Sequence, residues 1–281
     1  MRHIVRLDDV WTRRKVVSIG SVMLATLATA STEVALRDMI AMGRDLGFSG
    51  WSEGRLVARP GHRNREVAPG LHRLGLDRER DALLYVPAGY QPHDPAPFVL
   101  ALHGAGGVAS SGLYPLQALA DEAGLVLLSP ASRGRTWDVI LGAFGPDIDF
   151  IDQALVGTFG RCAIDPTRMA VSGFSDGASY ALSIGITNGD LFPHVIAFSP
   201  GFAAPADQHG EPRLFLSHGT EDEVLAIDRT SRRLVPELSG AGYPVEYVEF
   251  DGGHSVPEEI ARRGLAWFFD GAAELAATPE S

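Results

Sequence analysis

Residues 168–185 read RMAVSGFSDGASYALSIG, and their pattern is the strongest indication of the fold. A short apolar run leads into Gly173-Phe174-Ser175-Asp176-Gly177, and an alanine-rich segment typical of a helix follows. A G-x-S-x-G sequence between a strand and a helix is typical of a tight turn that exposes a serine nucleophile. Side chains at both glycine positions would collide with the neighbouring elements. The pattern therefore predicts a nucleophilic Ser175 at the edge of a sheet; the alternative is an ordinary glycine-rich turn.

Short apolar runs alternate with helical stretches on both sides of this turn. Near-continuous apolar strands that alternate with helices predict an α/β fold with a mostly parallel central sheet covered on both faces and no large cap domain. The expected strands are 81–90, 98–104, 125–132, 168–174, 194–200, 213–219 and 245–250, and the expected helices are 116–124, 148–160, 178–189 and 257–270. We expect one catalytic domain over 66–270, an N-terminal extension or linker over 31–65 and a C-terminal tail over 271–281.

The first thirty residues have the layout of an export signal. A basic stretch with paired Arg13 and Arg14 precedes a mildly apolar run over 16–27, and the small residues Ala28-Thr29-Ala30 end it. This order resembles a twin-arginine signal and predicts a periplasmic or secreted protein. The alternative is an amphipathic helix at the N-terminus of a cytoplasmic protein. The run is too short and too polar to predict a stable membrane span.

Composition excludes several classes of partner. The formal net charge of −11 over 281 residues argues against nucleic acid, which requires a basic face. Cys162 is the only cysteine, so the chain forms no intrachain disulfide, and we expect it to be a small buried residue. The histidines are scattered, without H-E-x-x-H or a cysteine pair, so the sequence predicts neither a metal nor another cofactor. It leaves the oligomeric state open.

A serine hydroxyl needs a base to become nucleophilic, and His254 is the candidate. It follows the expected strand 245–250 and precedes the last helix, so it lies at the same sheet edge as Ser175. His194 begins a strand and is expected at the opposite edge, whereas His218 is expected to shape a turn. The base should be the last member in the order serine, acid, histidine.

The acid that orients the histidine should follow the strand 213–219. Asp222 is the candidate, within the sequence SHGTEDEVL, and its neighbours Glu221 and Glu223 are expected to be solvated. An ionised carboxylate at this position would hold the imidazole tautomer and stabilise the imidazolium.

A glycine-rich loop and a second segment are candidates for the substrate site. The sequence His103-Gly104-Ala105-Gly106-Gly107 follows a buried strand and predicts an oxyanion hole formed by the N–H groups of Ala105 and Asp176, with Gly104 as the alternative donor beside the substrate. His103 is expected to shape this loop. The apolar side chains of the segment 133–147 are expected to line an acyl or alcohol pocket, or else to anchor a packed loop; they are Trp137, Ile140 and Phe144.

Five segments in order carry a resemblance to a known family: LHGAGG, DIDFIDQAL, DPTRMAVSGFSDGASYAL, SHGTEDEV and GGHSVP. They resemble the esterase branch of the α/β-hydrolases, including the phospholipase/carboxylesterases and the polyhydroxybutyrate-depolymerase-like and feruloyl-type esterases, over about residues 80–270. The resemblance implies a serine hydrolase that cleaves small or polymer-attached carboxylic esters through an acyl-enzyme. The alternatives are a serine peptidase or amidase, and a non-catalytic binding protein on the same fold.

One residue departs from the pattern of this family. Asp176 follows the serine where many relatives carry Asn, Met or Gly. A carboxylate so close to the oxyanion is unfavourable unless it points away or is paired, and it disfavours anionic substrates.

Overall fold

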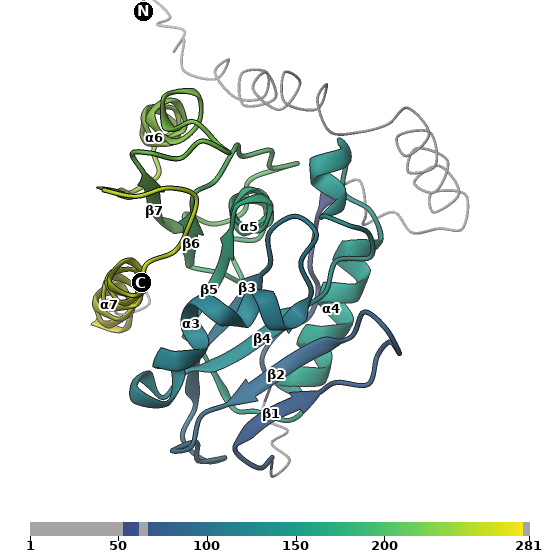
Figure 1. The fold of residues 1–281 in the computed structure, drawn as a ribbon. Coiled ribbons are helices and arrows are strands. Elements are labelled where there is room, and N and C mark those ends of the chain that lie inside the picture. Colours follow the sequence, from purple (N-terminus) through teal and green to yellow (C-terminus); the bar gives the residue numbers. More distant parts are fainter. Residues whose placement is uncertain (1–52, 62–66, 278–281) are drawn as a thin grey trace, which may run out of the picture.

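A computed structural model describes residues 53–61 and 67–277, the last seven by their backbone alone. Eight strands form one sheet in the order β1-β2-β4-β3-β5-β6-β7-β8 (Figure 1). The pairs β1–β2 and β2–β4 are antiparallel, and all other pairs are parallel. The strands are β1 (Gly70–Arg73), β2 (Ala82–Val86), β3 (Ala96–Leu102), β4 (Val126–Pro130), β5 (Ile164–Phe174), β6 (His194–Phe198), β7 (Arg213–Gly219) and β8 (Val245–Phe250).

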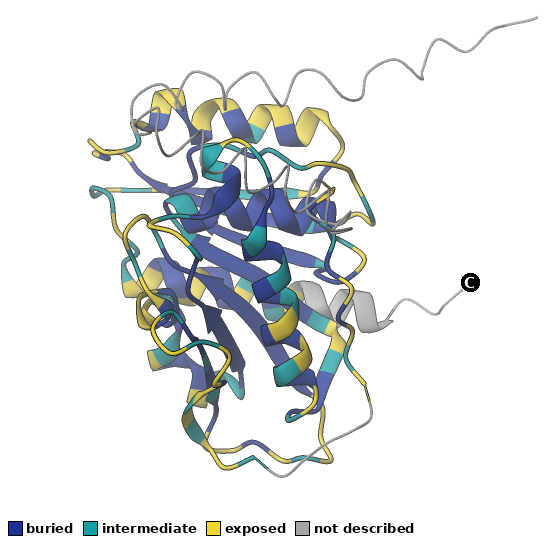
Figure 2. Cartoon of the chain, turned by 90° about the vertical axis from the view of Figure 1, so that its right-hand side faces the viewer, coloured by how far each residue is buried: buried dark blue, intermediate teal, exposed yellow. Residues whose placement is uncertain are grey.

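Helices cover both faces of the sheet. The side chains of α3 and α7 pack into one apolar cluster, and those of α4, α5 and α6 pack into the other. In Figure 2 the strands are coloured mostly as buried, and the exposed residues of the helices lie on the outer side of the molecule. The helices are α3 (Ala109–Ala123), η3 (Asp138–Leu141), α4 (Pro146–Phe159), α5 (Asp176–Thr187), η4 (Ile227–Arg229), α6 (Ser231–Gly240) and α7 (Glu258–Ala277).

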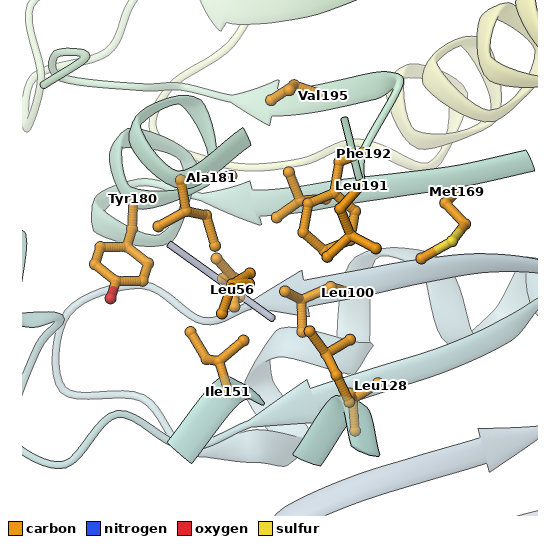
Figure 3. Packing of buried hydrophobic residues seen from close by; sticks show 14 of the residues in the cluster. Leu56, Leu100, Leu128, Ile151, Met169, Tyr180, Ala181, Leu191, Phe192 and Val195 are labelled. Carbon is orange, nitrogen blue, oxygen red and sulfur yellow. The ribbon is translucent and has the colours of Figure 1, made fainter. Parts of the chain in front are cut away.

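The apolar strands supply both clusters because successive side chains point to opposite faces. In β3, Phe98 and Leu100 join the cluster under α4 and α5, whereas Val99 and Ala101 join the cluster under α3 and α7. Figure 3 shows Leu100 in the first cluster, with other side chains from the sheet and its covering helices. A strand that is apolar along its whole length is therefore what a doubly covered sheet requires.

The predicted fold class is confirmed: the sheet is mostly parallel and has helices on both faces. Within 67–277, the connections between strands contain only the helices listed above, so this part of the chain has no large cap domain. The sequence pattern missed β1, because four residues with every second one half-buried carry little signal. The last helix continues through 277, past its expected end at 270. Among the described helices, none is both long and apolar enough to cross a bilayer.

Part of the predicted extension packs against the domain. Leu56 is 1% exposed and lies in the cluster between α4 and α5, as Figure 3 shows. Its N–H donates to Oδ1 of Asn188 at 2.9 Å, and Nδ2 of Asn188 donates to the Gly54 carbonyl at 2.9 Å. The N–H groups of Val57 and Ala58 donate to Oδ1 of Asp152 in α4, both at 2.8 Å, so residues 53–61 are held across two helices. The predicted domain boundaries remain predictions, and the predicted export signal over 1–30 lies outside the described residues.

Candidate active site

Ser175 lies on the turn between β5 and α5, with φ 58° and ψ −122°. A non-glycine residue with this φ is strained, and such strain persists only where the surroundings enforce it. The Ser175 N–H donates to the Phe198 carbonyl at 3.0 Å, which ties the turn to β6. A Cβ at Gly173 would overlap the backbone of Gly177, and a Cβ at Gly177 would overlap the Leu102 carbonyl. Both glycines are therefore needed for the turn, as predicted from sterics.

The loops after β7 and β8 bring Asp222 and His254 to this turn. Nε2 of His254 lies 2.9 Å from Oγ of Ser175, and Nδ1 lies 2.6 Å from Oδ2 of Asp222. With an ionised Asp222, Nδ1 carries the proton and Nε2 is free to accept a proton from the serine. The three side chains thus form one chain of hydrogen bonds.

Asp222 is held as a carboxylate. Burial raises its pKa, but the N–H of Leu225 at 2.7 Å, the imidazole of His254 and the N–H of Val224 at 2.9 Å outweigh burial, so the pKa is below its ordinary value. An ionised acid at this position accepts the Nδ1–H bond and stabilises an imidazolium.

The structure places two of the other histidines in buried positions away from Ser175. His218 lies under the acid: Nε2 contacts the Leu225 carbonyl at 2.7 Å and Asp222 Oδ2 at 3.2 Å, and Nδ1 contacts Ser231 Oγ at 2.7 Å. Burial lowers its pKa, so it is neutral at pH 7. His194 begins β6 at the opposite edge, and burial lowers its pKa to about 4.

The glycine-rich loop after β3 borders the turn, since a Cβ at Gly104 would lie 3.4 Å from the Cβ of Ser175. Two of its N–H groups are engaged: Gly106 donates to the Arg135 carbonyl at 2.6 Å, and Gly107 donates to the Gly104 carbonyl at 3.1 Å. The N–H groups of Gly104 and Ala105 are then the candidate oxyanion donors of this loop. Asp176 begins α5, so its N–H points out of a helix N-terminus, where partial positive charge accumulates.

His103 shapes the loop and cannot serve as a base. Its Nε2 accepts the Ser132 N–H at 3.0 Å, which puts the ring proton on Nδ1, and Nδ1 donates to the Gly104 carbonyl at 2.7 Å. Burial lowers the pKa of this imidazole to about 4. The ring is therefore neutral and fully engaged.

The aromatic side chains of the segment 133–147, one of whose expected roles was to line a substrate pocket, are buried in the core. Trp137 is 0% exposed, Phe144 is 3% exposed, and both rings contact Tyr180 of α5, at 5.0 and 5.9 Å between centroids. They anchor the loop in the core, which was the alternative interpretation, because large aromatic side chains gain more from burial than from lining an open surface. Ile140 is half-buried beside the same cluster.

The side chain of Asp176 is paired, which is one of the two conditions that the sequence analysis set for a carboxylate beside a candidate oxyanion hole. Oγ1 of Thr136 donates to its Oδ2 at 2.6 Å. Burial raises the pKa of this carboxyl, whereas the Thr136 bond and the nearby His254 oppose that shift. The sequence offered no signal for this pair, because the two residues lie 40 positions apart.

A row of hydroxyls on α5 was also missed by sequence reasoning. The loop 199–207 leaves β6 beside Ser175, and its N–H groups at Gly201, Ala204 and Ala206 donate to side-chain oxygens at 2.9, 3.0 and 3.2 Å. The acceptors recur every fourth residue on one helix face and are Ser179, Ser183 and Thr187. The four-residue spacing of these hydroxyls can be seen in the sequence, but the loop N–H groups that bind them cannot be predicted from it.

Among the described residues, no group of three or more His, Cys, Asp or Glu side chains has the arrangement of a metal site.

Comparison with known proteins finds sequence relatives named as esterases. No family model matches the chain. The chain is 23% identical over 225 residues to the probable feruloyl esterase C of Aspergillus niger, which covers 68% of this chain and 81% of that protein. It is also 23% identical over 208 residues to the feruloyl esterase C of Emericella nidulans, which covers 62% of this chain and 76% of that protein.

Solved structures share the architecture. The CE1 ferulic acid esterase of the anaerobic fungus Anaeromyces mucronatus superposes with a TM-score of 0.54 at 19% identity, over 77% of this chain and 100% of that chain. The fold is that of the α/β-hydrolases. Within that class, the predicted resemblance to the esterase branch, whose members cleave carboxylic esters, is confirmed.

Proposed function

We propose that this protein is a serine hydrolase of carboxylic esters in which Ser175 is the nucleophile, His254 the general base and acid, and Asp222 the orienting carboxylate. One observation carries the proposal: His254 bridges Ser175 Oγ at 2.9 Å and Asp222 Oδ2 at 2.6 Å. Both distances lie in the range that proton transfer and tautomer control require.

The chemistry follows from this chain of hydrogen bonds. Oγ of Ser175 attacks the ester carbonyl carbon while its proton passes to Nε2 of His254. The carbonyl oxygen becomes an oxyanion, which accepts the N–H of Asp176 and one N–H of the Gly104-Ala105 pair. The tetrahedral intermediate collapses, and His254 gives its proton to the departing alcohol. Water then attacks the acyl-enzyme with His254 as base, which releases the acid and restores Ser175.

The first substrate class to test is esters of hydroxycinnamic acids, because sequence relatives carry the name feruloyl esterase. The loop 133–147 contributes buried anchors at Trp137 and Phe144, so we assign neither residue to the acyl pocket. Ile140 remains a candidate for that pocket.

The test compares ester and amide substrates on matched variants. We expect the wild type to hydrolyse p-nitrophenyl acetate and methyl ferulate and to leave peptide p-nitroanilides intact. Ser175→Ala should lower kcat by roughly 10⁴–10⁶-fold, because the nucleophile is lost while the fold is kept. Ser239→Ala on the exposed surface of α6 is the control, with unchanged turnover. Full activity in Ser175→Ala, or cleavage of anilides without esters, would refute the proposal.

We also propose that residues 1–30 act as an export signal, on the paired arginines and the A-x-A sequence described above. N-terminal sequencing of the protein recovered from the expressing cell is the test. A mature chain that begins near Ser31 is expected, and an intact N-terminus in the cytoplasm would contradict it.

A further inference from the structure

Three consecutive residues after β4 contact both segments that carry the candidate oxyanion donors. The Arg135 carbonyl accepts the Gly106 N–H at 2.6 Å, and Nε1 of Trp137 donates to the His103 carbonyl at 2.8 Å. Between them, Oγ1 of Thr136 donates to Oδ2 of Asp176 at 2.6 Å. Residues 135 and 137 thus hold the loop after β3, and residue 136 holds the first residue of α5.

We propose that Thr136 is a positioning residue that acts through Asp176 and sets the separation between the two halves of the oxyanion hole. One half is the N–H of Asp176, and the other is the Gly104-Ala105 pair. The proposal rests on the proposed function, which gives these N–H groups their role. We name residues 135–137 the oxyanion clamp.

The clamp has a rigid support, so it can hold both halves in place. The Trp137 ring is 0% exposed and lies between His103 and Tyr180, with centroids at 4.8 and 5.0 Å. Tyr180 belongs to the first turns of α5, the helix that Asp176 begins. The loop therefore contacts α5 at two points, which restricts both the position and the tilt of the helix N-terminus.

The geometry of oxyanion stabilisation makes such support consequential. Donors must lie about 2.7–3.1 Å from the position of the oxyanion, and the loss of one donor typically costs roughly 10²–10³-fold in kcat. A misplacement of about 1 Å has a cost on the order of 10²-fold. The clamp also accounts for the acidic residue after the nucleophile: the Asp176 carboxylate is a strong acceptor for the Thr136 hydroxyl, and the bond turns one of its oxygens toward the loop.

The test compares Thr136→Val, which keeps the shape and loses the hydroxyl, with Thr136→Ser, which keeps the hydroxyl. With p-nitrophenyl acetate, we expect Thr136→Val to lower kcat about 10–100-fold with KM nearly unchanged. The Ki of a boronic acid, which mimics the tetrahedral intermediate, should rise by a similar factor. Thr136→Ser should stay within about threefold of the wild type. A merely structural role would lower the melting temperature without this split between kcat and KM.

A double-mutant cycle tests whether Thr136 acts through Asp176. In an Asp176→Ala background, Thr136→Val should have no further effect on kcat, because its partner is gone. If Thr136→Val does not fold, the pair Asp176→Asn and Asp176→Leu replaces it: Asn keeps an acceptor oxygen and should retain more turnover than Leu.

The proposal is overturned if the effects of Thr136→Val and Asp176→Ala add independently, or if Val and Ser at position 136 lose activity equally. It is also overturned if only KM changes. Failure of the proposed function would be seen separately, as ester turnover that survives in Ser175→Ala, so the two failures are distinguishable.

Discussion

Two loops leave the sheet beside Ser175, and they are held in opposite ways. The loop after β4 and the first residues of α4, together residues 131–147, are held by buried carboxyl groups and aromatic rings. The loop after β6, residues 199–207, is held by neutral hydroxyls on α5 at spacings of four residues. Both loops are therefore held in place, but only the loop after β4 depends on the ionisation of buried groups.

The charged anchor of the first loop is a pair of aspartates. Oδ2 of Asp138 accepts the Asp147 N–H at 2.9 Å, and Oδ2 of Asp147 accepts the Asp138 N–H at 2.8 Å. Burial raises the pKa of Asp147 to about 6. Burial and the neighbouring Asp147 raise the pKa of Asp138 well above its ordinary value. The pair thus holds its proton more strongly in the folded protein than in the unfolded chain.

The neutral anchor of the second loop has no such dependence. Each hydroxyl accepts one loop N–H and donates to the carbonyl four residues earlier in the chain, at 3.3, 2.7 and 2.8 Å for Ser179, Ser183 and Thr187. Hydroxyls do not ionise in the physiological range, so the bonds are the same at pH 5 and pH 8. The two loops beside Ser175 therefore differ: the anchor of the loop after β4 depends on pH, and the anchor of the loop after β6 does not.

The largest expected effect removes the aromatic anchor of the first loop. Trp137→Ala should lower the free energy of unfolding by about 3–5 kcal/mol, since it opens a cavity and leaves the His103 carbonyl without its donor. Chemical denaturation measures the loss. Ile140→Ala, at a half-buried position of the same loop, is the control and should lose less than half as much. If the two losses are equal, Trp137 is not the anchor.

The next prediction concerns the pH dependence of stability, which should differ between the anchors of the two loops. Because the folded-state pKa values of Asp138 and Asp147 are raised, their contribution to stability is greatest at low pH and falls as pH rises from near 4 through about 6 and above. Asp138→Asn keeps an acceptor oxygen and removes one charge. Its free energy of unfolding relative to the wild type should therefore increase by about 1–3 kcal/mol between pH 5 and pH 8. A difference that is constant with pH would mean that this pair does not titrate.

The smallest effect belongs to the hydroxyl row. Ser183→Ala leaves the Ala204 N–H without an acceptor and should cost about 1 kcal/mol, equally at pH 5 and pH 8. Thr187→Ser, which keeps its hydroxyl, is the control and should cost less. A loss for Ser183→Ala that varies between the two pH values would break the distinction between the two loops.

Much of the fold was predictable because it follows from local chemistry. Strands apolar on both faces, separated by helical segments, require a doubly covered parallel sheet, and this was found. Gly173 and Gly177 mark the turn at Ser175 because a Cβ at Gly173 would overlap the backbone of Gly177, and a Cβ at Gly177 would overlap the Leu102 carbonyl at the end of the neighbouring strand β3. The strand β1 was missed because a short edge strand has neither length nor a strong apolar pattern.

The candidate site was predictable where chain order dictates position. In a parallel sheet the loops after successive strands meet at one edge, so Asp222 and His254 had to approach Ser175. The distances of 2.6 Å between His254 Nδ1 and Asp222 Oδ2 and of 2.9 Å between His254 Nε2 and Ser175 Oγ agree with that reasoning. The sequence left open whether Trp137 and Phe144 line a pocket or anchor a loop, because an apolar side chain gives the same pattern in both cases; their burial favours the anchor.

By itself, then, the sequence determined the sheet, the strained turn and the order of serine, acid and histidine, since each depends on neighbouring residues or on the direction of strands. Three contacts could be seen only in the folded protein: Thr136 binds Asp176, Asp138 and Asp147 share a buried site, and residues 53–61 dock beside Asn188. These contacts join loops through side-chain geometry. Such geometry arises only when the packed elements bring distant parts of the chain within hydrogen-bonding distance.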